Sequence, residues 1–220
     1  MQGKTLVSVS LIFFLVISPG DGLSVPDNRV RSRRWNGGYK TASKRLADIP
    51  KKKKIHLDLV ANGIVKTLEK KRQETLQHVL SKAIIWKLFM NEYPSLEIEF
   101  DIKDPDYLPD VVDVSNGEDI AFWGEAGRMK VHKAVDLMQR YPDAHIVHIR
   151  WGMNITNISQ PLEAHLQAKL ESGELDLSKR TGRFTFCSLP LDVWRFIDDE
   201  TGVISVEKED LEWKELSFPQ

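Results

Sequence analysis

The sequence is poor in the residues that mark several familiar kinds of site. Its 220 residues include a single cysteine, Cys187, so an internal disulfide is excluded and nothing indicates an oxidising compartment. Cys187 lies in the strand-like stretch FTFCSL, where a buried, unreactive thiol is expected. The sequence also has no phosphate-binding glycine loop, no zinc-ligand spacing and no internal repeat. Sites built on those features are therefore set aside.

One apolar run stands out, near the start of the chain. Residues 1–22 have one lysine, an apolar run from Thr5 to Ile17 and then small residues, which resembles a signal peptide and is too short for a comfortable membrane span. Residues 23–54 are basic and have the composition of a transit peptide or disordered segment. This leader predicts an organelle reached through the secretory route, such as a plastid; secretion and a mitochondrial leader are the alternatives. Without the leader no stable membrane span is expected.

The charge is unevenly distributed although the net charge is only -1. Residues 28–54 hold eleven lysines and arginines against one acid, Asp48, so the rest of the chain is acidic. A basic arm on an acidic body suggests a targeting segment, a nucleic-acid arm or a solvated tail. We interpret the run Lys51 to Lys54 as a solvated linker, which would contact phosphates only if it survived processing.

Residues 55–220 are expected to form a single domain. The apolar periodicity predicts strands and helices in an order that includes helix, three strands, helix and strand, which indicates an α/β fold with a mixed sheet flanked by helices. The predicted strands are 55–60, 96–102, 109–114, 119–125, 145–151, 183–189 and 202–207. The predicted helices are 68–90, from 128 to 141, 161–171 and a short one at 191–197.

The stretch PDVVDVSNGEDIAFWGEAG, residues 109–127, predicts a hairpin with an Asn-Gly turn, because a type I′ turn needs positive φ at both central residues. Paired residue numbers then sum to 233, and Asp110 faces Trp123. Glu125 becomes a diagonal neighbour of Asp110 on the same face, with Cα atoms roughly 7–8 Å apart, unless a bulge intervenes.

Two such acids repel each other, and a hard cation would offset the repulsion. Lys130 and Lys133 follow on the next helix, where a lysine could orient or deprotonate a water. This set suits metal-assisted hydrolysis of a phosphodiester. In the alternative interpretation Asp110 caps a turn, Glu125 ends a strand and both lysines are solvated.

These motifs, together with RQETLQHVLSKAIIWKLF and YPDAHIVHIRW, resemble the PD-(D/E)XK nuclease-like superfamily, in particular its YaeQ-like branch, over about residues 68–152. The resemblance implies an αβββαβ core. It also implies metal-binding roles for Asp110 and Glu125, with Glu74 as an additional metal ligand from the helix. Gly127 stands where the usual pattern has its lysine, and Lys133, with Lys130 as the second choice, would supply that group from the next helix.

Two functions follow from the resemblance. The first is a Mg²⁺-dependent or Mn²⁺-dependent nuclease-like enzyme that acts on nucleic acid. The second is a catalytically inactive nucleic-acid-binding or regulatory module of the same fold, which the glycine at position 127 favours. His145 and His148 are three apart on a predicted strand and face opposite sides, so they make a poor metal pair.

Overall fold

The computed structural model describes residues 54–104, 106–114 and 119–217. The predictions for the leader, residues 1–22, for nearly all of the basic segment, residues 23–54, and for the turn at Asn116 and Gly117 therefore lie outside the described residues. Among the described residues, no helix has the length and apolar character needed to cross a membrane.

The domain begins with an antiparallel hairpin of β1 (Ile55–Ala61) and β2 (Ile64–Lys70). Asn62 and Gly63 join the strands and both have positive φ, 49° and 76°, as a type I′ turn requires. The sequence analysis predicted the first strand but not the second. The predicted start of the next helix at residue 68 is wrong, because Leu68 belongs to β2.

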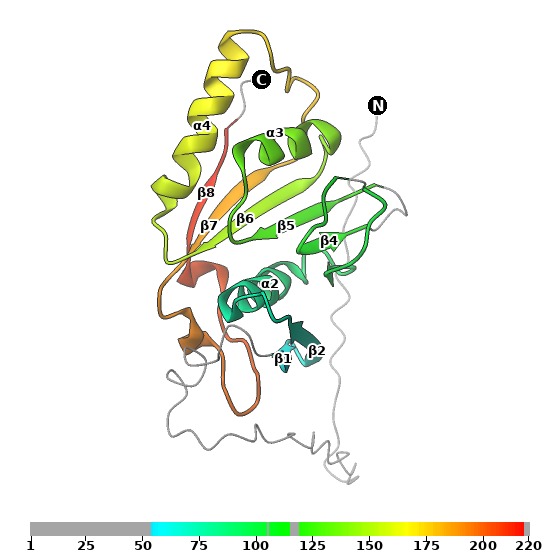
Figure 1. Ribbon diagram of the computed structural model, residues 1–220, viewed down its shortest axis with the longest axis vertical. Helices are drawn as coiled ribbons and strands as arrows, with labels where there is room; N and C mark the ends of the chain where they lie inside the picture. Colours follow the sequence, from blue (N-terminus) through cyan, green and yellow to red (C-terminus); the bar gives the residue numbers. More distant parts are fainter. Residues whose placement is uncertain (1–53, 105, 115–118, 218–220) are drawn as a thin grey trace, which may run out of the picture. The chain divides into compact units, whose positions relative to one another are not determined.

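Helix α2 (Leu76–Phe89) follows, with Thr75 as its N-cap. The Thr75 side chain accepts a hydrogen bond from the backbone N–H of His78, which satisfies one of the free donors at the helix start. All but two residues of α2 are buried. A helix that is apolar on most of its circumference is expected to be buried on most sides. In Figure 1, α2 lies between the β1–β2 hairpin and a second sheet, which explains this composition.

The second sheet is mixed and has the strand order β3-β4-β5-β6-β7-β8. Strands β5, β6 and β7 are parallel to one another, whereas β3, β4 and β8 pair antiparallel with their neighbours. The strands are β3 (Glu97–Ile98), β4 (Val111–Asp113), β5 (Phe122–Ala126), β6 (His145–Trp151), β7 (Phe184–Leu189) and β8 (Glu212–Glu215). The predicted α/β class, with a mixed sheet and flanking helices, is confirmed.

Helices cover both faces of this sheet. Helix α2 packs on one face, and α3 (Val131–Arg140) and α4 (Ile155–Glu171) pack on the other (Figure 1). Along β5 the side chains alternate accordingly: Phe122 joins the core under α2, and Trp123 joins the core under α3 and α4. Two short 3₁₀ helices, Val193–Phe196 and Lys208–Asp210, complete the described elements.

Several predicted boundaries need correction. The strand predicted at 96–102 keeps only two residues, and α4 starts at Ile155 rather than at 161. The predicted strand 202–207 forms only isolated bridges, from Val203 to Val60 and from Ile204 to Ile197. Strand β8 was not predicted, because its sequence EWKE is mostly polar.

The register of β4 and β5 also differs from the prediction. Val112 pairs with Trp123 and Asp113 with Phe122, so paired numbers sum to 235 instead of 233. The prediction that Asp110 faces Trp123 is therefore wrong. The ladder between β4 and β5 ends at the Asp113–Phe122 pair.

Gly124 is the point where β5 approaches α2 most closely. A Cβ at this position would lie 2.9 Å from Ile85 Cγ2 and 3.2 Å from Val111 Cβ.

Gly124→Ala should therefore overpack this core and lower the free energy of unfolding by about 1–3 kcal/mol. Urea denaturation measures this loss. Val65→Ala, at a half-exposed site in β2, should change the free energy by less than about 0.5 kcal/mol. Equal stability of Gly124→Ala and wild type would contradict the packing.

Candidate functional site

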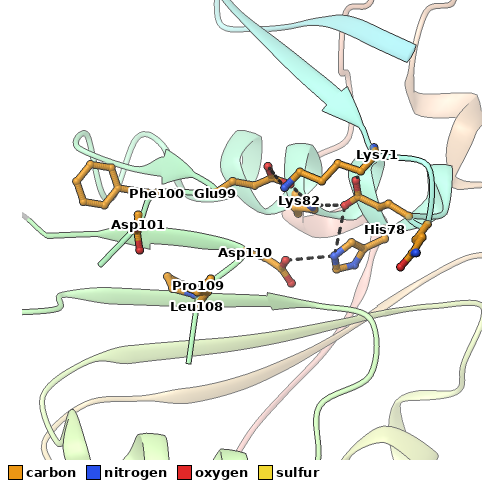
Figure 2. A pocket seen from close by; sticks show the side chains of 11 residues that line it. Lys71, His78, Lys82, Glu99, Phe100, Asp101, Leu108, Pro109 and Asp110 are labelled. Atoms are coloured by element: carbon orange, nitrogen blue, oxygen red, sulfur yellow. Dashed lines mark hydrogen bonds and ion pairs between the residues drawn. The ribbon is translucent and has the colours of Figure 1, made fainter. Parts of the chain in front are cut away.

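A pocket of about 480 Å³ opens at the start of α2. Its walls come from the β2–α2 connection, from α2 itself, and from the segments beside β3 and β4 (Figure 2). Most of the side chains that line it are polar or charged, and its apolar wall is short. The lining residues are Lys71, Gln73, Glu74, His78, Lys82, Glu99, Phe100, Asp101, Leu108, Pro109 and Asp110.

A buried lysine organises one side of this pocket. The Lys82 side chain is only 3% exposed, and its ammonium group forms ion pairs with the carboxylates of Glu74 and Glu99. Lys71 contacts the other oxygen of Glu99, with Nζ 3.0 Å from Oε2. Burial lowers the pKa of Lys82, but the two carboxylates outweigh burial and raise that pKa above its ordinary value. The two carboxylates therefore favour the charged form of Lys82 inside the pocket wall.

Asp110 reaches the same pocket because the strand is irregular just before β4. The backbone N–H of Asp110 donates to the carbonyl of Gly124, which is already the ladder partner of Val111. Two residues of one strand thus face a single residue of the other, which is the arrangement of a β-bulge. The Asp110 side chain lies on the side of α2, with Oδ1 3.2 Å from His78 Nε2, and Oδ2 accepts a 2.8 Å hydrogen bond from the N–H of Ala126.

His78 connects the two acids of the pocket. Its Nε2 atom lies 3.2 Å from Asp110 Oδ1 and 3.6 Å from Glu74 Oε1 (Figure 2). Burial raises the pKa of Asp110, but the hydrogen bond and charge of His78, the Ala126 N–H and the Lys82 charge together lower that pKa below its ordinary value. Asp110 is thus held as a carboxylate, which is the form that binds cations.

Glu125 points to the opposite side of the sheet. It shares the face of Trp123, and its Oε1 accepts 2.7 Å hydrogen bonds from Trp123 Nε1 and from Lys133 Nζ on α3. Burial raises the pKa of Glu125; Lys133 opposes this rise without cancelling it, and the negative charge of Asp110 adds to it. The two acids are therefore electrostatically coupled, but each carboxylate has its own partner on a different helix, His78 on α2 and Lys133 on α3.

The residues predicted from the sequence thus fall into two groups. Asp110 and Glu74 lie together in the pocket, whereas Glu125 and Lys133 pair with each other outside it. Lys130 is exposed at the start of α3, where its side chain makes no capping hydrogen bond. No group of three or more histidine, cysteine, aspartate or glutamate side chains arranged to hold a metal ion occurs within the described part of the chain.

Neither His78 nor Lys82 was predicted from the sequence as a residue of the site. A signal was present, because Glu74, His78 and Lys82 are spaced four residues apart and such residues share one face of a helix. His78 and Lys82 lie within the quoted motif RQETLQHVLSKAIIWKLF, but the resemblance assigned a role only to Glu74 of that stretch.

Gly127 has a local reason to be glycine. Its φ of +84° lies in the left-handed region, and a Cβ there would lie 3.4 Å from His78 Nδ1. The backbone therefore disfavours a lysine at this position. The histidine of α2 occupies the space beside it.

Comparisons with known proteins give a likeness of fold only. No protein-family model matches the chain, and no curated protein sequence matches it. Two solved structures are similar, both with 15% sequence identity. The match with the YaeQ protein from Xanthomonas axonopodis pv. citri has a TM-score of 0.38 and spans 62% of this chain and 73% of that protein's chain. The YaeQ protein from Pseudomonas syringae has a TM-score of 0.40, with coverage of 68% and 78%. Likeness at this level carries no conclusion about activity.

Removing the buried lysine should destabilise the fold. Lys82→Met leaves the carboxylate of Glu74 without its lysine and that of Glu99 with Lys71 alone, and it should lower the free energy of unfolding by about 3 kcal/mol at pH 7. Lys87→Met is the matched control on the same helix, because the Glu207 partner of Lys87 is 64% exposed and stays hydrated. In urea denaturation, Lys87→Met should lower the free energy of unfolding by less than half as much as Lys82→Met.

The cost of Lys82→Met should also depend on pH. The pKa of Glu99 is lowered, because the hydrogen bonds and charges of Lys82 and Lys71 outweigh the raising effect of burial. This contribution is present above the unfolded pKa of about 4.3 and is lost as the pH falls through the folded pKa. The difference between wild type and variant should shrink below about pH 4. A difference that is constant with pH would contradict the ion pairs.

The coupling of Glu125 can be measured by NMR titration of its carboxyl carbon. Lys133→Met should raise the pKa of Glu125, because the lysine stabilises the carboxylate, and Asp110→Asn should lower it, because the repulsion disappears. The pKa of Asp198, which hydrogen bonds from Thr201 lower in a loop outside the pocket lining, serves as the internal control. If Asp110→Asn leaves the pKa of Glu125 unchanged, the two acids are not coupled.

Proposed function

We propose that this chain is a nuclease-like protein whose pocket binds a divalent cation, Mg²⁺ or Mn²⁺, and uses it to hydrolyse a phosphodiester. The observation that carries the proposal is the convergence of Asp110 and Glu74 on one point of the pocket, beside His78 Nε2. Mg²⁺ commonly takes only one or two carboxylates and keeps several waters, so two carboxylates in an open pocket suit it.

The charge of the pocket supports a cation. Four acids line it, Glu74, Glu99, Asp101 and Asp110, against two lysines, Lys71 and Lys82. A phosphodiester is an anion and would be repelled by this excess of carboxylates unless a cation offset it. The bound metal ion would supply this charge and would activate a water for attack on phosphorus.

The other side chains of the pocket have roles that do not require a lysine at position 127, where the family resemblance would place one. His78 lies between the two carboxylates and orients them through Nε2, which is 3.2 Å from Asp110 Oδ1 and 3.6 Å from Glu74 Oε1. The Lys82 ammonium group forms an ion pair with the Glu74 carboxylate, and the Ala126 N–H donates a hydrogen bond to Asp110. These two contacts hold the carboxylates in place. In this arrangement Glu125 and Lys133 act on the pocket through charge, and Lys130 remains a solvated residue.

Membership of the PD-(D/E)XK superfamily is part of the proposal. Its support is the order of α2, β3, β4, β5, α3 and β6, with Asp110 at the start of β4 and Glu125 near the end of β5.

The alternative is a module of the same fold that binds nucleic acid without cleaving it. Two observations favour it: the φ of Gly127 disfavours a lysine there, and the Glu125 carboxylate already has the Lys133 ammonium as its cation. Binding without cleavage would separate this alternative from the first proposal.

Calorimetric titration with Mn²⁺ and an oligonucleotide cleavage assay test the proposal together. Asp110→Asn and Glu74→Gln should each weaken Mn²⁺ binding by at least about tenfold, since each removes one of two charged ligands. Glu97→Gln is the control, because it removes a carboxylate on β3 outside the pocket lining. Glu125→Gln should keep Mn²⁺ binding, because Trp123 and Lys133 hold that carboxylate away from the pocket.

Cleavage by the wild type that persists in Asp110→Asn would remove the proposed role of this residue. Wild-type protein that binds oligonucleotides but neither binds Mn²⁺ nor cleaves would support the inactive module.

A further inference from the structure

The pocket at the start of α2 has an apolar end as well as an acidic one. Three of its lining residues form what we call the apolar shelf: Phe100, which is 47% exposed, Leu108, which is 63% exposed, and the buried Pro109. In Figure 2, these three side chains lie on the opposite side of Asp110 from His78. Six large apolar side chains are exposed among the described residues, and two of them belong to this shelf. The apolar exposure is therefore concentrated beside one pocket, which is a mark of a binding surface.

The backbone places Phe100 next to the acidic part of the pocket. Because β3 and β4 are antiparallel, the residues after Glu99 run alongside those before Asp110, and the N–H of Glu99 donates to the Asp110 carbonyl at 3.0 Å. Glu99 has a φ of +55°, in the left-handed region that residues other than glycine rarely adopt. Its carboxylate forms ion pairs with Lys71 and Lys82. Strained residues that surrounding contacts hold in this way cluster at functional sites.

The two ends of the pocket match the two ends of a nucleotide. In the proposed function the phosphate lies with the cation at Asp110 and Glu74, which leaves the flat ring of the base for the apolar shelf. Aromatic side chains stack on bases of any sequence, because every base has a π-face. Asp101 also lines the pocket and is not paired with any other described side chain, so its carboxylate can accept a hydrogen bond from an amino group of the base. The volume of about 480 Å³ is in the range of small-ligand pockets.

We propose that the apolar shelf stacks an unpaired nucleobase through Phe100, so that the substrate of the pocket is single-stranded nucleic acid. This inference deepens the proposed function and rests on it for the choice of nucleic acid as the ligand. In a duplex each base is paired and lies inside the stack, where a protein side chain reaches its face only after the base has been extruded. A single strand offers the same face without that cost.

NMR titration of the full chain with adenosine in EDTA tests the apolar shelf by itself. Adenosine has no phosphate and therefore needs no cation, and its amino group can donate to Asp101. Phe100→Ala should weaken adenosine binding at least about fivefold, because the stacking contact is lost, and Phe100→Trp should retain binding. Leu191→Ala is the control, because Leu191 is 69% exposed and lies outside the pocket lining. Wild-type protein that does not bind adenosine, or a loss as large in the control as in Phe100→Ala, overturns the inference.

Competition in Mg²⁺ tests the choice of a single strand. A single-stranded oligonucleotide should displace adenosine at least about tenfold more readily than a duplex of the same sequence, because paired bases are held inside the stack. A duplex that competes equally well, or a single strand that does not compete, overturns the inference. The proposed function fails separately: adenosine binding that depends on Phe100, in a protein that neither binds Mn²⁺ nor cleaves oligonucleotides, removes the cation site and supports the base site.

Discussion

The burial of α2 is the constraint on which the rest of the structure depends. The helix lies between a two-stranded hairpin and a six-stranded sheet, so any charge along its length must be neutralised inside the protein. Lys82 is such a charge, and the carboxylates of Glu74 and Glu99 neutralise it. The pocket forms around this ion-pair group at the start of the helix. The carboxylates that neutralise Lys82 inside the protein therefore also belong to the candidate site.

The positions of Asp110 and Glu125 follow from the strands rather than from the turn between them. The observed register of β4 and β5 differs from the predicted one by two residues, and such a shift does not change the face on which a side chain lies. The shift alone would therefore have left Asp110 and Glu125 on one face. The bulge at Asp110 is what separates them, because it turns this side chain toward α2 while Glu125 stays on the side of α3. The separation gives each carboxylate its own environment: the pKa of Asp110 is lowered and that of Glu125 is raised.

The sequence predicted the architecture better than the site. Strand β6 is rich in apolar residues and was predicted with its observed bounds, and the α/β class followed from the order of the elements. The hairpin at Asn62 and Gly63 carried the same turn signal that was applied at residues 116–117, but its second strand was not predicted. The last three residues of that strand, Leu68–Lys70, were interpreted as the start of a helix. The bulge has no signature in the sequence, because it depends on how β4 meets β5. His78 could have been found from its spacing to Glu74, whereas its contact with Asp110 depends on that bulge.

Gly127 lies between two different electrostatic environments of the sheet. On the α2 face, Asp110 and Glu74 lie near His78, and a Cβ at Gly127 would come within 3.4 Å of that histidine. On the α3 face, the Glu125 carboxylate pairs with Lys133, with Oε1 2.7 Å from Nζ. The φ of +84° at Gly127 disfavours a side chain at this position. The two acids therefore influence each other through charge, because the negative charge of Asp110 contributes to the raised pKa of Glu125.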